Sequence, residues 1–275
     1  MPELPEVETI ANGLDRRVAG DSIESVWLGS KPEPLKSPAA EIVRVLEGTR
    51  IQKVRRVGKH IVFDLHSIKK NKKEEVRQWV VHLGMTGRVL VVSPQEEVAK
   101  HTHAIVRLKS GREVRFVDPR RFGRLAVVHK EQGFVGPGTE PTTITLEPFI
   151  QLFRKRKTPI KAALLNQGLL HGVGNIYADE SLFRAGIRPR RQAGRLSRVE
   201  LERLHKAVKE VLAEAIKLGG SSVSDYVDAD GEEGFFQLRH RVYLRTGEPC
   251  LVCKTPIKRI VLAGRGTHYC PKCQK

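Results

Sequence analysis

The segment Gly133-Phe134-Val135-Gly136-Pro137-Gly138-Thr139-Glu140-Pro141 separates two stretches of sequence that follow different patterns. Its three glycines and two prolines break every hydrophobic periodicity, as a connection between structural elements does. The chain has 275 residues, whereas single cores rarely grow past ~250 residues, so more than one domain is expected. We predict an N-terminal domain at 1–131, a linker at 132–143, a helical domain at 144–240 and a C-terminal tail at 241–275.

Short strand-like runs fill the sequence before this segment. They lie at residues 23–28, 51–57, 60–65, 79–83, 88–92, 104–108, 113–116 and 125–128. Turn residues separate them, and strands do not alternate with helices as they do in a parallel sheet, so the pattern predicts an antiparallel β-sandwich or barrel. Apolar residues at helical spacing also predict an amphipathic helix at 5–18, and a second, shorter helix is predicted at 39–46.

Helical signals dominate the sequence after the segment. Thr158 and Pro159 have the residue types of an N-cap and a first helical position. The longest helix is predicted to begin at the capping box formed by Ser197 and Glu200 and to end at the glycine pair 219–220. The chain is therefore predicted to be an α+β protein of several domains.

All four cysteines lie in the tail, as the pairs Cys250, Cys253 and Cys270, Cys273. Two C-x2-C pairs at this separation are typical of a zinc ribbon, in which four thiolates surround one structural Zn2+ and leave no open position for catalysis. Disulfide bonds are the weaker alternative, because nothing else in the sequence indicates an oxidising compartment.

Between the cysteine pairs, residues 260–268 read as a strand, a turn and a returning strand. Gly264 and Gly266 allow Arg265 to lie at the tip of this hairpin, where its guanidinium can bind a phosphate. A solvated turn arginine fits the same spacing.

The chain carries 49 lysines and arginines against 31 acidic residues, a net charge of +18. So large an excess points to a polyanionic partner, and nucleic acid is favoured because no amphipathic membrane-surface helix is evident. Basic ribosomal or heparin-binding surfaces have similar composition. The sequence contains no run of 18 apolar residues and no apolar signal segment, so we expect a cytoplasmic protein with no membrane span.

The sequence begins with Met1, Pro2 and Glu3. Removal of Met1 would leave Pro2 with a free secondary amine next to a carboxylate. An α-amino group has a pKa near ~8, so about a tenth of it is a neutral nucleophile at pH 7, able to attack an aldehyde carbon. The alternative is that this segment only begins a helix.

Further candidate site residues lie at predicted turns and on one predicted strand. Residues 171–180 contain a Gly-x-Gly before Asn175, which can place the N-terminus of a helix near a phosphate, although such a motif is often a plain turn. Met85 and Phe122 lie in glycine-containing turns, where apolar side chains pack at an edge or enter a base stack. His101 and His103 are placed to share one face of a strand, which suggests either a metal-dependent hydrolase or a phosphate or structural contact.

Taken together, these segments resemble the formamidopyrimidine-DNA glycosylase family, bacterial enzymes that remove oxidised purines from DNA. Six separated motifs carry the resemblance in order: Pro-Glu-Leu-Pro-Glu-Val-Glu at 2–8, Lys59 in a strand hairpin, His-Leu-Gly-Met-Thr-Gly at 82–87, Asp-Pro-Arg-Arg-Phe-Gly at 118–123, Gly-Asn-Ile-Tyr-Ala-Asp-Glu-Ser-Leu-Phe at 174–183, and the zinc ribbon with Arg265. The resemblance implies an N-terminal β-sandwich, a helix-two-turns-helix domain and a zinc finger, with DNA bound in the cleft between them.

The resemblance also implies a mechanism. Pro2 would attack C1′ of the damaged nucleotide to form a Schiff base, with Glu3 as general acid/base, and β,δ-elimination would then cut the strand. Lys59 and Arg265 would hold phosphates and assist the elimination. A loop at 221–237 would close over the everted base.

The remaining implied residues contact double-stranded DNA containing an oxidised base. They are His101, Arg120, Arg156, Asn175, Met85 and Phe122. Met85, Arg120 and Phe122 would together fill the gap that the everted nucleotide leaves in the duplex. A monomeric state and a bacterial, cytoplasmic and nucleoid-associated location are the matching expectations. The alternatives are an endonuclease VIII-like glycosylase for oxidised pyrimidines and a non-catalytic zinc-ribbon DNA-binding protein.

Overall fold

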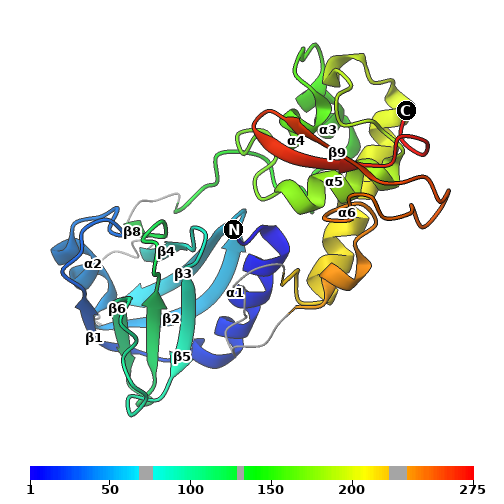
Figure 1. Cartoon of the computed structure of the whole chain (residues 1–275). Coiled ribbons are helices and arrows are strands. Elements are labelled where there is room, and N and C mark those ends of the chain that lie inside the picture. The colour runs from blue at the N-terminus through cyan, green and yellow to red at the C-terminus, as the bar shows by residue number, and fades with distance from the viewer. Residues whose placement is uncertain (68–76, 129–132, 223–233) are drawn as a thin grey trace. The chain divides into compact units, whose positions relative to one another are not determined.

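The chain folds as two compact units. The computed structural model describes residues 1–67, 77–128, 133–222 and 234–275 (Figure 1). The first unit comprises Met1–Val135 with Ser221–Gly234, and the second comprises Gly136–Gly220 with Phe235–Lys275. The boundary between Val135 and Gly136 lies within the glycine-rich segment at 133–141. No helix in the described part of the chain is long and apolar enough to span a membrane.

The first unit contains two antiparallel sheets of four strands each, in the orders β1-β6-β7-β5 and β2-β3-β4-β8. The strands are β1 (Ile23–Leu28), β2 (Thr49–Val57), β3 (His60–Ser67), β4 (Arg77–His82), β5 (Arg88–Val92), β6 (Thr102–Leu108), β7 (Glu113–Val117) and β8 (Arg124–Val128). Side chains of both sheets enter one apolar core, which includes Phe63, Trp79 and Phe116. The predicted antiparallel β-sandwich is confirmed, and every predicted strand is present.

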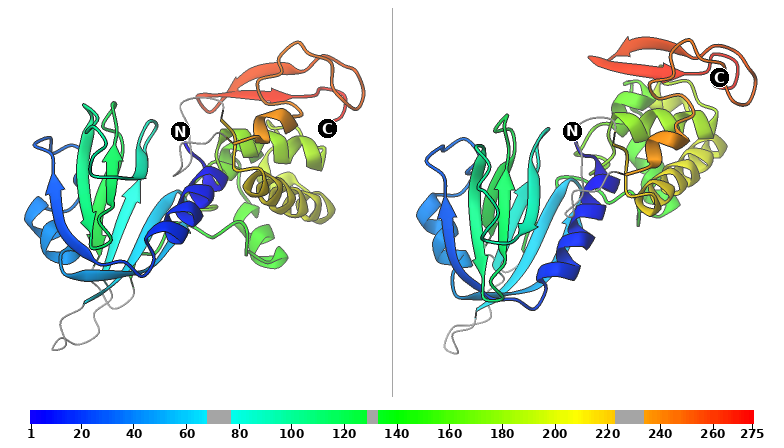
Figure 2. Two further views of the ribbon diagram at one scale, coloured as in Figure 1. Left: turned by 90° about the horizontal axis from the view of Figure 1, so that it is seen from below. Right: turned by 60° about the horizontal axis from the view of Figure 1, so that its bottom comes forward.

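Two helices accompany the sheets of the first unit. Helix α1 (Leu4–Val18) lies alongside β2 (Figure 2), and helix α2 (Ala39–Leu46) packs against β1. Val7, Ile10 and Leu14 of α1 are buried, because apolar residues at intervals of three and four form one face of the helix. Both predicted helices are confirmed.

His101 differs from its prediction. It lies in the turn before β6, whereas His103 lies within β6, so the two do not share a strand face. A break in the register of β6 against β7 between Thr102 and Ala104 adds a further irregularity at this end of the strand. The alternation rule assumes regular pairing, which this end of the strand lacks.

The second unit is mainly helical and carries a hairpin. Its elements are α3 (Leu146–Phe153), α4 (Ile160–Leu164), α5 (Asn175–Ala185), the 3-10 turn η1 (Ala193–Arg195), α6 (Arg198–Lys217), the 3-10 turn η2 (Phe236–Arg239), β9 (Lys258–Leu262) and β10 (Arg265–Tyr269). The capping box of Ser197 and Glu200 is present, and Gly219 and Gly220 follow α6 with positive φ angles. Helix α3 was not predicted, because eight mostly apolar residues around a proline carry little helical periodicity.

Glu180 of α5 fixes the chain that enters the C-terminal tail. Its Oε1 accepts from the backbone N–H groups of Val242 and Tyr243 at 3.0 and 2.8 Å, and its Oε2 accepts from that of Arg241 at 2.9 Å. Burial raises the pKa of this carboxyl, while the three hydrogen bonds favour its charged form.

A row of five aromatic rings runs through the second unit. Successive ring centroids of Tyr177, Phe236, His240, Tyr243 and His268 lie 5.1 to 5.6 Å apart. Burial within this row lowers the pKa of His240 to about 4, because the charged imidazolium loses its hydration.

The depressed pKa of His240 predicts that acid destabilises the second unit. The unfolded chain binds a proton to this histidine below a pH of about 6.5, but the folded chain does so only below about 4. The free energy of unfolding should therefore fall between these pH values, by up to about 3 kcal/mol. We expect His240→Phe to remove this part of the pH dependence in denaturant titrations followed by helical circular dichroism.

Tryptophan fluorescence provides the control for that experiment. Both tryptophans, Trp27 and Trp79, lie in the first unit, so their signal should not distinguish His240→Phe from the wild type. An identical pH dependence of the circular dichroism transition in the two proteins would contradict the prediction.

Candidate active site and nucleic-acid interface

Glu6 fixes the backbone at the amino terminus. Glu3 is 6% exposed, and its N–H donates to Glu6 Oε2 at 2.8 Å. The other Glu6 oxygen accepts from the N–H of Ser221, also at 2.8 Å. A buried carboxylate thus joins the residues around Pro2 to the beginning of the segment predicted as a loop at 221–237. This contact places Ser221 in the first unit rather than in the predicted helical domain, and residues 223–233 lie outside the described residues.

Lys59 lies in the turn between β2 and β3 and is buried. Arg56, at the end of β2, donates to Glu8 of α1 at 2.5 Å and to the carbonyl of Gly58 at 3.3 Å. Gly58 has a φ of +59°, a conformation that favours glycine, and so allows the tight turn. The hairpin that carries Lys59 is therefore tied to the helix that follows Pro2 and Glu3.

Asp118 joins two loops of the first unit. Its Oδ1 accepts from the hydroxyl of Thr86 at 2.5 Å and from the N–H of Arg120 at 3.2 Å. Its Oδ2 accepts from the N–H of Gly123 at 2.7 Å. Asp118 is fully buried, so these donors replace the water that a carboxylate otherwise binds. Asp118 belongs to the motif at 118–123, but the motif alone does not indicate this supporting role.

The two loops joined by Asp118 expose the side chains that were predicted to enter DNA. Met85 is 43% exposed and Phe122 is 47% exposed, and the Arg120 guanidinium carbon lies 4.8 Å from the centroid of the Phe122 ring. Gly84 approaches the backbone of Phe122 so closely that a β-carbon on it would lie 2.5 Å from the carbonyl carbon. The predicted trio of Met85, Arg120 and Phe122 therefore comes from adjoining loops.

The two histidines of the metal alternative do not form a metal site. His103 is buried, and its Nε2 lies 2.9 Å from the carbonyl oxygen of Asp118. Within the described residues, the four cysteines are the only group of three or more side chains placed to hold a metal ion. His103 therefore makes a structural contact, which was one of the alternatives to a metal ligand. A histidine-based metal site is absent from the described part of the chain.

Asn175 begins helix α5 and contacts the ribbon hairpin. Its Nδ2 donates to the carbonyl of Gly266 at 3.0 Å. Lys161 of α4 donates to the same carbonyl and to the hydroxyl of Thr267, each at 2.9 Å. Arg265, the residue before Gly266, is exposed at the start of β10, as predicted for the hairpin tip. Asn175 and Arg265 are thus brought together within the second unit.

A buried ion pair supports this hairpin. The Lys161 ammonium lies 2.7 Å from Asp179 Oδ1, and the two side chains are 1% and 0% exposed. Asp179 Oδ2 accepts from the N–H of His268 at 2.8 Å and lies 3.1 Å from its Nδ1. Neither role is evident from the sequence, because a lysine near other basic residues resembles ordinary surface charge. The one feature of the sequence that could have indicated the buried role of Lys161 is its position among the apolar residues of α4.

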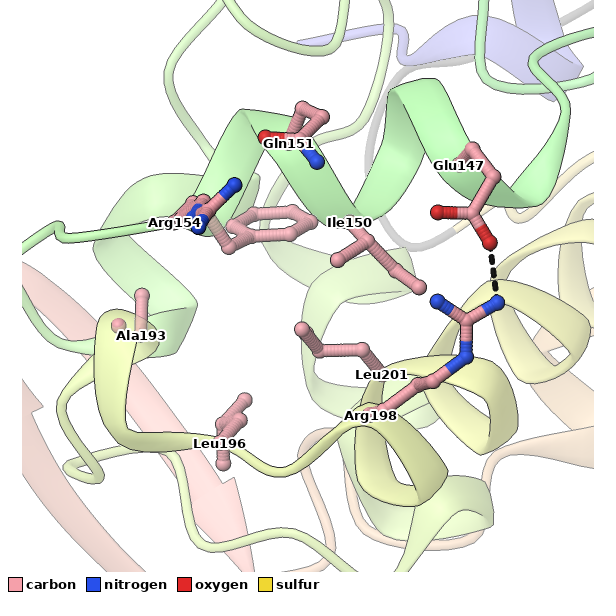
Figure 3. Close-up of a pocket in the computed structure, with 10 residues that line it drawn as sticks. Glu147, Ile150, Gln151, Arg154, Ala193, Leu196, Arg198 and Leu201 are labelled. Atoms are coloured by element: carbon pink, nitrogen blue, oxygen red, sulfur yellow. Dashed lines mark hydrogen bonds and ion pairs between the residues drawn. The ribbon is translucent and has the colours of Figure 1, made fainter.

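Arg156 is exposed in the turn after α3, and its Nε donates to the carbonyl of Leu152 at 2.5 Å. A cavity of about 270 Å³ lies nearby, between α3 and the start of α6 (Figure 3). Its walls include Ile150 and Leu201, and the ion pair of Glu147 with Arg198 lies at one side (Figure 3). None of the predicted site residues lines this cavity.

The four cysteines fit a zinc ion. Their sulfur atoms all lie within 4.8 Å of one another, with Cys250 Sγ 3.9 Å from Cys273 Sγ and Cys253 Sγ 3.4 Å from Cys270 Sγ. Zn–S bonds of ~2.3 Å in a tetrahedron place sulfurs ~3.8 Å apart. No two of these sulfur atoms are joined by a disulfide bond, and the gathering of all four in one cluster favours the metal site over the disulfide alternative.

The protonation of these thiols is uneven. Hydrogen bonds from Thr255 lower the pKa of Cys253 to about 6, whereas burial raises the pKa of Cys270. Zinc binds thiolates, so its binding must displace protons from the buried thiols. The cluster can hold one structural zinc ion, as predicted.

Comparison with known proteins gives a consistent result along the whole chain. Residues 1–125 match the formamidopyrimidine-DNA glycosylase N-terminal domain, residues 135–227 match the formamidopyrimidine-DNA glycosylase H2TH domain, and residues 247–275 match a zinc finger found in FPG and IleRS. Formamidopyrimidine-DNA glycosylases of Solibacter usitatus and Listeria monocytogenes are 44% and 42% identical, each aligned over 100% of both chains.

Solved structures agree. The crystal structure of MutM (Fpg) from Thermus thermophilus has a TM-score of 0.85 at 42% identity, covering 99% of this chain and 98% of that one. A Lactococcus lactis Fpg mutant in complex with a Fapy-dG containing DNA has a TM-score of 0.88 at 32% identity, with full coverage of both chains. A complex of wild-type Lactococcus lactis Fpg with an oxidised pyrimidine containing DNA has a TM-score of 0.87 at 33% identity, also with full coverage.

Removing the partner of the buried lysine should destabilise the second unit. Asp179→Ala leaves Lys161 charged and buried, which costs about 3–5 kcal/mol of unfolding free energy. We expect the loss in denaturant titrations followed by helical circular dichroism, with the tryptophan transition of the first unit unchanged. Glu147→Ala is the matched control, because it breaks an exposed ion pair with Arg198, and its transition should coincide with that of the wild type.

Zinc removal should unfold the ribbon without unfolding the first unit. Structural zinc contributes about 10–16 kcal/mol to the folding of zinc-finger peptides near pH 7, so chelation should abolish duplex binding by the hairpin that carries Arg265. Metal analysis should find one zinc ion per chain, and Cys253→Ser should reproduce the effect of chelation. Undiminished DNA binding by the metal-free protein would contradict this prediction.

Proposed function

Because the chain belongs to the formamidopyrimidine-DNA glycosylase family, we propose that Pro2 and Glu3 carry out its reaction. The chain is a base-excision-repair DNA glycosylase with the abasic-site lyase activity characteristic of the family, and it excises oxidised purines. The observation that carries the residue assignment is the placement of both residues before α1, where the Glu3 backbone is fixed by Glu6.

The reaction begins once Met1 is removed, because the nitrogen of Pro2 is an amide while Met1 is attached. The secondary amine attacks C1′ of the damaged nucleotide, the bond between C1′ and the base breaks, and the base leaves with a proton. Opening of the sugar gives an iminium between Pro2 and C1′, which makes the proton at C2′ acidic. Glu3 serves as general acid/base in these proton transfers, and it follows Pro2 directly in the chain.

Lys59 and Arg265 bind phosphates of the DNA and assist the two eliminations that cut the strand. Arg265 suits this role because it is exposed and its guanidinium has no ion-pair partner among the described residues. Asn175, Arg156 and His101 are the further proposed DNA contacts. The pairing of Asn175 with the Gly266 carbonyl supports a shared phosphate-binding surface with Arg265.

Met85, Arg120 and Phe122 occupy the space left by the everted nucleotide. Everting a base from a duplex costs a few kcal/mol, which contacts to the remaining stack and the orphaned base offset. The exposure of these three side chains on adjoining loops, and the common support from Asp118, favour this role. The segment at 221–237 is proposed to close over the everted purine.

The substrate is double-stranded DNA containing an oxidised base, bound by a single copy of the chain in the cytoplasm at the bacterial nucleoid. Oxidised pyrimidines are a second candidate substrate, because a related Lactococcus lactis enzyme was solved with an oxidised pyrimidine containing DNA. The net charge of +18 supports binding to the phosphate backbone with a steep dependence on salt.

Borohydride trapping tests the nucleophile. The processed protein, mixed with a duplex containing 8-oxoguanine opposite cytosine, should form a covalent adduct and cut the strand. Pro2→Gly should lose both, whereas Glu3→Gln should slow base release by about 10²–10⁴-fold. Pro94→Gly makes the same change at an exposed proline and should behave as the wild type.

Two outcomes would contradict the assignment. Full trapping and cleavage by Pro2→Gly would place the nucleophile elsewhere. Salt-sensitive binding without adduct or strand scission in the wild type would favour the non-catalytic DNA-binding alternative. A parallel duplex with an oxidised pyrimidine distinguishes the two substrate classes.

A further inference from the structure

A cavity of about 720 Å³ lies in the second unit, at the end of α5 opposite to Asn175. Residues of α5, α6 and the zinc ribbon line it. Phe183 and Val252 contribute apolar surface, and Val252 is 69% exposed although a valine is usually buried. The cavity therefore offers the exposed side chain of Val252 and the uncovered part of Phe183, whose ring otherwise packs against the core of the ribbon.

The charge at this cavity is positive. Arg203 and Arg241 line it, both are exposed, and neither guanidinium has an ion-pair or hydrogen-bond partner among the described residues. The other charged side chains of α5 and α6 at the cavity are neutralised within the unit. Arg184 donates to Glu214 at 2.7 Å, and Glu200 is paired with Arg191. The two unpaired arginines are thus available to an anionic occupant.

The cavity and the proposed phosphate-binding surface lie at opposite ends of α5. Helix α5 has 11 residues, and at ~1.5 Å per residue its two ends lie about 15 Å apart. Asn175 is at the first end and the cavity at the second. Along the ribbon, the hairpin turn near Arg265 and the carboxyl end of the chain lie at opposite ends (Figure 1). The phosphates and sugars of a DNA backbone are also polar, so they would gain little from contact with the apolar side chains of Phe183 and Val252.

We propose that this cavity binds an acidic peptide segment of a partner protein that carries a large apolar side chain. Carboxylates of the peptide pair with Arg203 and Arg241, which provides electrostatic complementarity at the rim. The apolar side chain enters between Phe183 and Val252, where its burial contributes most of the affinity. The proposed site leaves Asn175 and Arg265 open to DNA.

The test uses the full-length, zinc-loaded protein and the fluorescence anisotropy of a labelled synthetic peptide in which aspartates alternate with phenylalanines. We expect saturable binding to the wild type. Arg203→Glu and Arg241→Glu should each weaken it by about fivefold or more, because an attraction is replaced by a repulsion. Val252→Asp should also weaken it. Arg195→Glu is the matched control, since Arg195 is exposed but does not line the cavity, and it should bind the peptide as the wild type does.

A second peptide with serine in place of each phenylalanine should bind at least about fivefold more weakly, because it lacks the apolar contact. If the two peptides bind with equal affinity, or if Arg195→Glu and Arg203→Glu lower the peptide affinity equally, the binding comes from the net positive charge of the protein. Either result would overturn the proposal. Unchanged peptide binding with a loss of duplex affinity confined to Arg203→Glu and Arg241→Glu would make the cavity a DNA site, which also overturns it. Zinc content and cleavage of abasic-site DNA should match the wild type in every variant.

Discussion

A carboxylate buried away from water must find hydrogen-bond donors within the protein, and in this chain loop backbones supply many of them. Glu6 accepts from the N–H groups of Glu3 and Ser221. Asp118 accepts from two backbone N–H groups and a hydroxyl, and Glu180 accepts from three consecutive N–H groups. Asp179 accepts from the backbone of His268 and pairs with a buried lysine. Glu6, Asp118 and Glu180 therefore determine where irregular segments lie, and Asp179 does the same for strand β10.

These irregular segments carry the residues proposed to act on DNA. Loops have little regular hydrogen bonding of their own, so a side chain on a loop is positioned only if something else fixes its backbone. Asp118 does this for Met85, Arg120 and Phe122. The pair of Lys161 with Asp179 holds strand β10, which begins at Arg265. These four carboxylates are buried and hydrogen-bonded within the protein. Their negative charges are therefore absent from the surface, which is correspondingly more basic.

Much of this architecture could be predicted from the sequence, because it depends on local patterns. Strand runs, the capping box before α6 and the spacing of the four cysteines are read from neighbouring residues, and each was found in the structure. The supporting carboxylates could not be predicted in the same way. Asp179 and Lys161 are 18 positions apart, and their contact depends on how α4 and α5 pack. The prediction that His101 and His103 share a strand face was wrong for a related reason, because the position of His101 depends on where β6 begins.

The distinction between paired and unpaired cations explains why net charge identifies a partner class but not a site. Lys161 is as cationic in the sequence as Arg265, yet Asp179 neutralises it and burial removes it from any ligand. Arg265, Arg203 and Arg241 are exposed, and their guanidinium groups have no partner among the described residues. The first lies on the ribbon hairpin beside Asn175, and the other two lie beside an apolar cavity. The same charge therefore suits a phosphate in one place and an acidic, partly apolar segment in the other, because the neighbouring surface differs.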